Sequence, residues 1–205
     1  MRMRPHSIDK KVLSRIYGHG RGWVFTPTAF MDLGSRMAVD SALARHKRTG
    51  TIRQLARGLY DYPIEHPKMG LVAPAADAVA RAIARRDAVR LQPAGAYAAN
   101  VLGLSEQVPT KIVFLTDGPA RRVKLGRREI VLMRTTPRNM ATAGRKSGTV
   151  IQALRHVGRR HVDGRMISIV DRQLSDSDRA QILKDLRYAP AWIADLLRPL
   201  AGAPR

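Results

Sequence analysis

Cysteine is absent from this chain of 205 residues, and aromatic residues make up only 5% of it. Without cysteine the protein can have no disulfide bond and no cysteine-ligated zinc site. Because aromatic side chains are few, the hydrophobic core must be built mainly from alanine, valine, leucine, isoleucine and methionine. Hydrophobic residues still make up 44% of the sequence, which is enough for a packed core and argues against wholesale disorder.

Long apolar runs are also missing. No stretch approaches the roughly 18 apolar residues of a membrane-spanning helix. The basic start of the chain, residues 1–5, is not followed by an apolar run, so we expect no secretory signal. Together with the lack of cysteine, these absences lead us to expect a cytoplasmic protein without a membrane partner.

Catalytic and metal-binding patterns are lacking as well. The six histidines are scattered, and the spacing of His156 and His161 does not place them on one helix face. No HExxH, GxSxG or paired-carboxylate motif is present. The glycines of residues 18–22 have no strand before them and no Lys-Ser/Thr after them, which argues against a phosphate loop. We therefore predict no catalytic residues, no metal and no cofactor, and a protein that is not an enzyme.

Acidic residues are scarce compared with basic ones. The chain has 37 Lys and Arg against 16 Asp and Glu, a formal net charge of +21. Such an excess repels itself in a compact fold, and a polyanionic partner relieves the repulsion. We interpret the charge as a sign of nucleic-acid binding. The alternative is a generally basic composition that serves only solubility.

The first part of the chain predicts a winged helix-turn-helix. Helical spacing of apolar residues, capping residues and glycine stops predict helices at 7–17, 27–33 and 36–49, with Ser7, Thr26 and Ser35 as N-caps. A short strand is expected at 23–25, and a hairpin at 51–55 and 59–62. Helix, strand, helix, turn, helix and hairpin in this order are typical of a winged helix-turn-helix DNA-binding domain, which we place at residues 1–66.

The rest of the chain predicts a second domain. Three prolines and a glycine at residues 63–76 indicate a linker. Beyond it we expect a helix at 77–88, a strand at 111–115 and a hairpin around residues 126–128, and mostly helices after Pro137. The predicted fold class is α+β: an N-terminal winged helix-turn-helix followed, at residues 67–205, by a mixed α/β domain with a helical C-terminal part.

The helix at 36–49 is the candidate reader of DNA bases. With Val39, Ala42 and Leu43 facing inward, its outer face carries Arg36 and Asp40. Arg36 has the donors for guanine O6 and N7. Asp40 either accepts a hydrogen bond from cytosine N4 or holds Arg36 at i, i+4 spacing. The alternative is an ordinary solvated helix face.

Further basic residues follow along the same segment. Arg45, Lys47 and Arg48 suit phosphate contact, although complementing the helix dipole also explains them. Arg53 and Arg57 lie in the hairpin, where a wing contacts phosphate or the minor groove. The complete set of candidate DNA-binding residues is Thr26, Ser35, Arg36, Met37, Asp40, Ser41, Arg45, Lys47, Arg48, Arg53 and Arg57.

A second basic region lies between residues 120 and 165, where thirteen Lys or Arg face only Glu129 and Asp163. Its candidate patch consists of the hairpin arginines Arg121, Arg122, Arg127 and Arg128. A solvated face, a second DNA contact and an acidic protein partner remain alternative explanations.

Two stretches resemble a known family. The string FTPTAFMDLGSRMAVDSALARHKRTGTIRQLARGLYDYP, residues 25–63, resembles the N-terminal part of AbiEi-type antitoxins of bacterial type IV toxin–antitoxin systems. Residues 90–138 resemble the start of the second domain of these antitoxins. The resemblance covers roughly residues 20–138, and the helices after Pro137 are less diagnostic.

The resemblance implies a function. Such antitoxins bind inverted repeats in their own promoter through a winged-helix domain, and their C-terminal domain supports cooperative repression and neutralises a nucleotidyltransferase-like toxin. On that pattern we expect a transcriptional repressor and antitoxin whose partners are operator DNA, a nearby-encoded toxin and further copies of itself on DNA. The alternative is a stand-alone nucleic-acid-binding regulator without a toxin.

Overall fold

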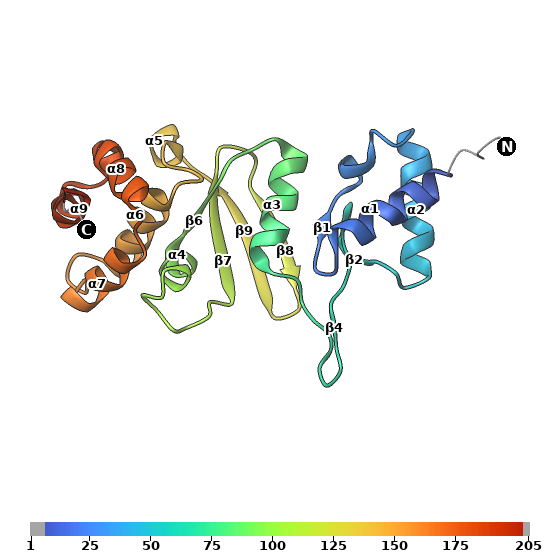
Figure 1. Ribbon diagram of the computed structural model, residues 1–205, viewed down its shortest axis with the longest axis horizontal. Helices are drawn as coiled ribbons and strands as arrows, with labels where there is room; N and C mark the ends of the chain where they lie inside the picture. Colours follow the sequence, from blue (N-terminus) through green and yellow to red (C-terminus); the bar gives the residue numbers. More distant parts are fainter. Residues whose placement is uncertain (1–6, 203–205) are drawn as a thin grey trace. The chain divides into compact units, whose positions relative to one another are not determined.

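The computed structural model describes residues 7–202 (Figure 1). The chain divides into two compact units after Ala88. The sequence had indicated a boundary after residue 66. The structure differs because helix α3 (Ala76–Asp87) packs on strand β1 (Val24–Phe25) and so belongs to the first unit.

The first unit is built from short helices and strands. In chain order they are α1 (Ile8–His19), β1, the 3-10 helix η1 (Pro27–Phe30), α2 (Arg36–Arg48), β2 (Arg53–Ala56), β3 (Leu59–Asp61), β4 (Glu65–His66), β5 (Gly70–Leu71) and α3. Strands β1, β3 and β2 form an antiparallel sheet with β3 in the centre. The segment expected as a linker instead contains the small antiparallel hairpin β4–β5.

Local sequence explains where the first helices begin. The Ser7 side chain accepts a hydrogen bond from the Lys10 amide and caps α1, and the Ser35 side chain accepts from the Ala38 amide and caps α2. Both caps were predicted from the sequence, because serine satisfies amides that have no partner in the first turn of a helix.

The core of the first unit lies between α1, α2 and the sheet. Its buried cluster consists of Val12, Ile16, Phe25, Phe30, Val39, Ala42, Leu43 and Ile52. Half of the aromatic residues lie in or against this cluster: Trp23, Phe25, Phe30, Tyr60 and Tyr62. The ring centroids of Phe25 and Phe30 lie 5.4 Å apart, edge to face, and those of Trp23 and Phe25 lie 4.5 Å apart. The predicted inward face of α2 is therefore confirmed.

The second unit combines a mixed sheet with a bundle of helices. Its elements are β6 (Leu91–Ala94), α4 (Gly95–Val101), β7 (Lys111–Thr116), β8 (Arg121–Leu125), β9 (Arg128–Arg134), α5 (Pro137–Met140), α6 (Lys146–Val157), α7 (Gly164–Arg172), α8 (Asp176–Asp185), the 3-10 helix η2 (Leu186–Tyr188) and α9 (Ala191–Gly202). The strand order is β6-β7-β9-β8; β7 and β9 run parallel, and the outer pairs are antiparallel.

The helices of the second unit share one apolar core. Helix α4 packs against α6, whose residues Val150 and Leu154 are fully buried together with Ile193 and Leu197 of α9. Figure 1 shows α6–α9 gathered at the C-terminal end of this unit. The mixed α and β composition and the helical C-terminal part, both predicted from the sequence, are confirmed.

Candidate nucleic-acid interface

The outer face of α2 is exposed to solvent. Val39, Ala42 and Leu43 point into the core, whereas Arg36, Met37, Asp40, Ser41 and Ala44 are exposed. Among the large apolar residues of the described part of the chain, Met37 is the most exposed, at 79%. The structure thus brings four of the candidate base-reading residues onto one side of the first turns of α2.

Arg36 and Asp40 form an ion pair on this face. The Arg36 Nε donates to Asp40 Oδ2 at 2.8 Å, and both side chains are about half exposed. Within residues 7–202 the terminal Nη1 and Nη2 atoms of Arg36 have no protein partner. Asp40 therefore fixes the orientation of the guanidinium while leaving the two nitrogens that suit a guanine edge available.

Tyr60 of β3 adds a donor that sequence reasoning missed. Burial raises the pKa of its hydroxyl, the Asp40 carboxylate raises it further, and Arg36 opposes the shift. A tyrosine hydroxyl is protonated at neutral pH even without such a shift, so Tyr60 can donate a hydrogen bond near the Arg36–Asp40 pair. The alternation of buried and exposed residues along β3 did not indicate that Tyr60 lies near Arg36 and Asp40. That placement depends on where α2 lies relative to the sheet.

The basic residues at the C-terminal end of α2 differ in their surroundings. Arg45 donates to Asp9 of α1 at 2.9 Å, and Lys47 donates to the Gln54 side chain of β2 at 2.7 Å. Both contacts tie α2 to neighbouring elements. Arg48 is exposed and makes no hydrogen bond or ion pair with another described residue.

The hairpin arginines also differ from each other. The Arg53 guanidinium donates to both oxygens of buried Asp61, at 3.1 and 2.6 Å, and to the Val72 carbonyl at 2.9 Å. Arg53 therefore holds the unit together. Arg57 lies at the exposed turn next to Gly58, whose φ of +68° suits glycine, and it has no partner among residues 7–202.

Thr26 does not have the role expected for it. Its side chain shares a hydrogen bond with Thr28, makes no capping bond, and is only 3% exposed. Helix η1 also ends at Phe30, before the expected residue 33. Because Thr26 is buried beside the aromatic cluster, its side chain does not face solvent with the other candidates.

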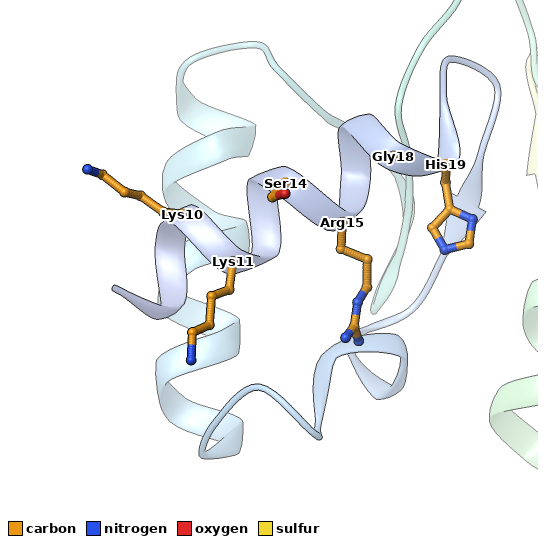
Figure 2. Close-up of a pocket in the computed structure, with 6 residues that line it drawn as sticks. All are labelled: Lys10, Lys11, Ser14, Arg15, Gly18 and His19. Atoms are coloured by element: carbon orange, nitrogen blue, oxygen red, sulfur yellow. The ribbon is translucent and has the colours of Figure 1, made fainter. Parts of the chain in front are cut away.

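The outer side of α1 forms a feature that sequence reasoning did not single out. An open cavity of about 670 Å³ is lined by Lys10, Lys11, Ser14, Arg15, Gly18 and His19, shown in Figure 2. Arg15 makes a paired contact with Asp32, and the hydrogen bond from Arg15 holds the pKa of the Asp32 carboxyl below its usual value. The i, i+4, i+8 spacing of Lys10, Ser14 and Gly18 could have indicated from the sequence that these residues share one face of α1.

The second basic patch lies on the β8–β9 hairpin. Arg121, Arg122, Arg127 and Arg128 are all exposed. Gly126, with a φ of +59°, is the first residue of the tight turn that joins the two strands, as a type II′ turn requires. The hairpin predicted at this turn is confirmed.

Within residues 7–202, no three His, Asp or Glu residues gather in a group that could hold a metal ion. Among the same residues, no helix combines the length and apolar character needed to cross a membrane.

The fold is similar to that of a solved protein. The crystal structure of the RV2827C protein from Mycobacterium tuberculosis matches with a TM-score of 0.50 and 17% sequence identity, over 99% of this chain and 80% of that one. At this identity the match shows the fold alone. No curated protein matches the sequence. A family model described as a family of unknown function, DUF6088, matches residues 11–182, and the chain therefore belongs to that family.

Proposed function

We propose that this protein is a DNA-binding transcriptional repressor whose first unit is a winged helix-turn-helix. In this proposal α2 enters the major groove and the β2–β3 hairpin is the wing. The observation that carries it is the exposed face of α2, where Asp40 orients Arg36 at the N-terminal end of the helix. The opposite face of α2 packs into the core of the first unit. N-terminal residues of such a helix contact base edges.

The residues divide into readers, phosphate contacts and supports. Arg36 is the reader, because its free terminal nitrogens match guanine O6 and N7. Arg48 and Arg57 are the phosphate contacts, since both are exposed without a partner in the described chain. Arg45, Lys47 and Arg53 are supports that hold α2 and the hairpin in place.

Arg127, in the exposed turn, and Arg128, at the start of β9, make an additional phosphate contact in this proposal. Residues 67–205 carry two thirds of the net charge, +14 of +21. For duplex DNA, each phosphate that the protein neutralises adds about 0.9 to the magnitude of the slope of log affinity against log salt concentration. Contacts from both units would therefore give a steep salt dependence.

The proposal extends to an antitoxin role, which the likeness of residues 20–138 to AbiEi-type antitoxins supports. On that basis the protein acts in the cytoplasm, binds inverted repeats in its own promoter, associates with itself on DNA and neutralises a nucleotidyltransferase-like toxin. Co-expression with the product of an adjacent nucleotidyltransferase gene tests this part: rescue of growth supports it, and continued growth arrest contradicts it. No such gene nearby would favour the stand-alone regulator.

The DNA-binding part is tested by titrating the full chain with duplex DNA from upstream of its own gene and with a shuffled duplex of the same length. We expect the upstream duplex to bind at least about 10³-fold more tightly, the lower end of the range for specific binding. Equal affinity for both would leave only nonspecific nucleic-acid binding, and no binding to either would overturn the proposal.

A further inference from the structure

One face of the sheet in the second unit carries an open cavity of about 600 Å³ that the proposed DNA contacts do not use. Its lining includes Val113, Val131 and Met133 as a floor, with Lys111, Arg121 and Arg122 around it. Val113 pairs with Val131 across β7 and β9, and Arg122 pairs with Val131 across β8 and β9. Val113, Val131 and Arg122 therefore stand side by side on one face of the sheet.

The floor is apolar, and its accessible part consists of Met133 and the partly exposed Val113. Met133 is 49% exposed, although it follows the buried residues Val131 and Leu132 in the same strand. Its partner on this face, Leu115, is buried against Met140 of α5, whereas Met133 stays half exposed. A hollow with an apolar floor and a few charged groups around it is the usual form of a binding site.

The rim is basic. Lys111 lies opposite Glu129 in the neighbouring strand, so this carboxylate offsets part of its charge. Arg122 lies opposite Val131 instead, and within residues 7–202 it has no ion pair. The rim as a whole keeps an excess of positive charge around Arg122, which selects an anionic occupant.

We propose that this cavity binds an acidic segment of a partner protein, anchored by one apolar side chain. The apolar floor takes the anchor, and Arg122 together with Lys111 takes the flanking carboxylates. Duplex DNA fits less well, because phosphate contacts need donors and gain nothing from an exposed methionine. A second copy of this chain is disfavoured by its own net charge of +21. The inference concerns the second unit and does not rest on DNA binding by the first.

The test uses the full chain with methyl-labelled methionine and a synthetic peptide in which one leucine is flanked by three glutamates on each side. The protein contains eight methionines, so the Met133 methyl signal is identified by its loss in Met133→Leu. We expect that signal to shift and saturate as the peptide is added. Replacing the peptide leucine by serine, or its glutamates by lysines, should weaken binding by about tenfold or more, equivalent to about 1.4 kcal/mol.

Matched protein variants locate the contact. The pair Lys111→Gln and Arg122→Gln should weaken peptide binding by about tenfold, whereas Arg159→Gln with Arg160→Gln, which removes equal charge from an exposed loop of the same unit, should leave it unchanged within about twofold. Unaltered signals of the other methionines show that each variant is folded. Equal weakening by both pairs, no shift of Met133, or a shift produced by duplex DNA but not by the peptide would overturn the proposal. None of these results bears on whether α2 binds DNA.

Discussion

Arg53 and Arg57 lie four residues apart in the same hairpin, and their environments differ. Arg53 neutralises Asp61, which is only 1% exposed, whereas Arg57 points into solvent. Arg53→Ala should lower the free energy of unfolding of residues 1–88 by about 3 kcal/mol, because it leaves a buried carboxylate without its partner. Arg57→Ala should change it by less than about 0.5 kcal/mol. Denaturant unfolding of both variants measures the difference, and similar losses would show that the assignment of roles is wrong.

Arg36 carries the specificity in the proposed function. Arg36→Ala should reduce discrimination at one base position by about 1–3 kcal/mol. Arg48→Ala, in the same helix but at its other end, should weaken all sequences alike and lower the salt slope by about one unit. Binding titrations against a panel of single-base operator variants separate the two outcomes. An unchanged ratio of specific to random binding in Arg36→Ala would mean that another face of α2, or another element, reads the DNA.

Helix α2 depends on its N-cap for the position of its first turn. Ser35→Ala removes the hydrogen bond to the Ala38 amide and should lower the free energy of unfolding by about 1 kcal/mol. Ser41→Ala makes the same substitution at an exposed position inside the same helix, where alanine is the better helix former, and should be neutral or slightly stabilising. The two variants are compared by thermal or denaturant unfolding. A cost at Ser41 equal to that at Ser35 would show that the cap makes no special contribution.

The elements that the sequence predicted well are those whose signals are local. Ser7 and Ser35 cap α1 and α2 as expected, and the inward face Val39, Ala42 and Leu43 followed from helical spacing. Thr26 does precede a short helix, as threonine before proline indicates, but the prediction that its side chain faces DNA is wrong. The side chain is buried and hydrogen-bonded to Thr28. The same local signals begin an α-helix and a 3-10 helix, so the sequence did not show that η1 would end at Phe30.

Contacts between residues that are far apart in the sequence could not be predicted from local patterns. Arg45 and Asp9 are 36 residues apart, so the support role of Arg45 could not be separated from a phosphate contact. The same holds for Arg53, whose partner Val72 lies within the segment expected to be a linker. The cavity around Met133 depends on the β7–β9 pairing, which brings together residues from separate segments.

At the scale of the whole molecule, the boundary after Ala88 determines which fragment is stable. Residues 1–88 retain α3, which packs on β1, and should unfold cooperatively. Residues 1–66 lack α3 and the partner of Arg53 at Val72, and should be less stable. Circular dichroism during thermal unfolding compares the two fragments. If 1–66 were as stable as 1–88, α3 would not be part of the first unit's fold.

The central claim is that α2 and the β2–β3 hairpin bind a defined operator. The most direct measurement is a hydroxyl-radical footprint of the full chain on DNA upstream of its own gene, repeated with Arg36→Ala. We predict protection over an inverted repeat, with half-sites one or more helical turns of about 10 base pairs apart if the protein binds as a pair, and loss of the discrete pattern in the variant. Uniform protection without boundaries, or a pattern that Arg36→Ala leaves intact, would contradict the claim.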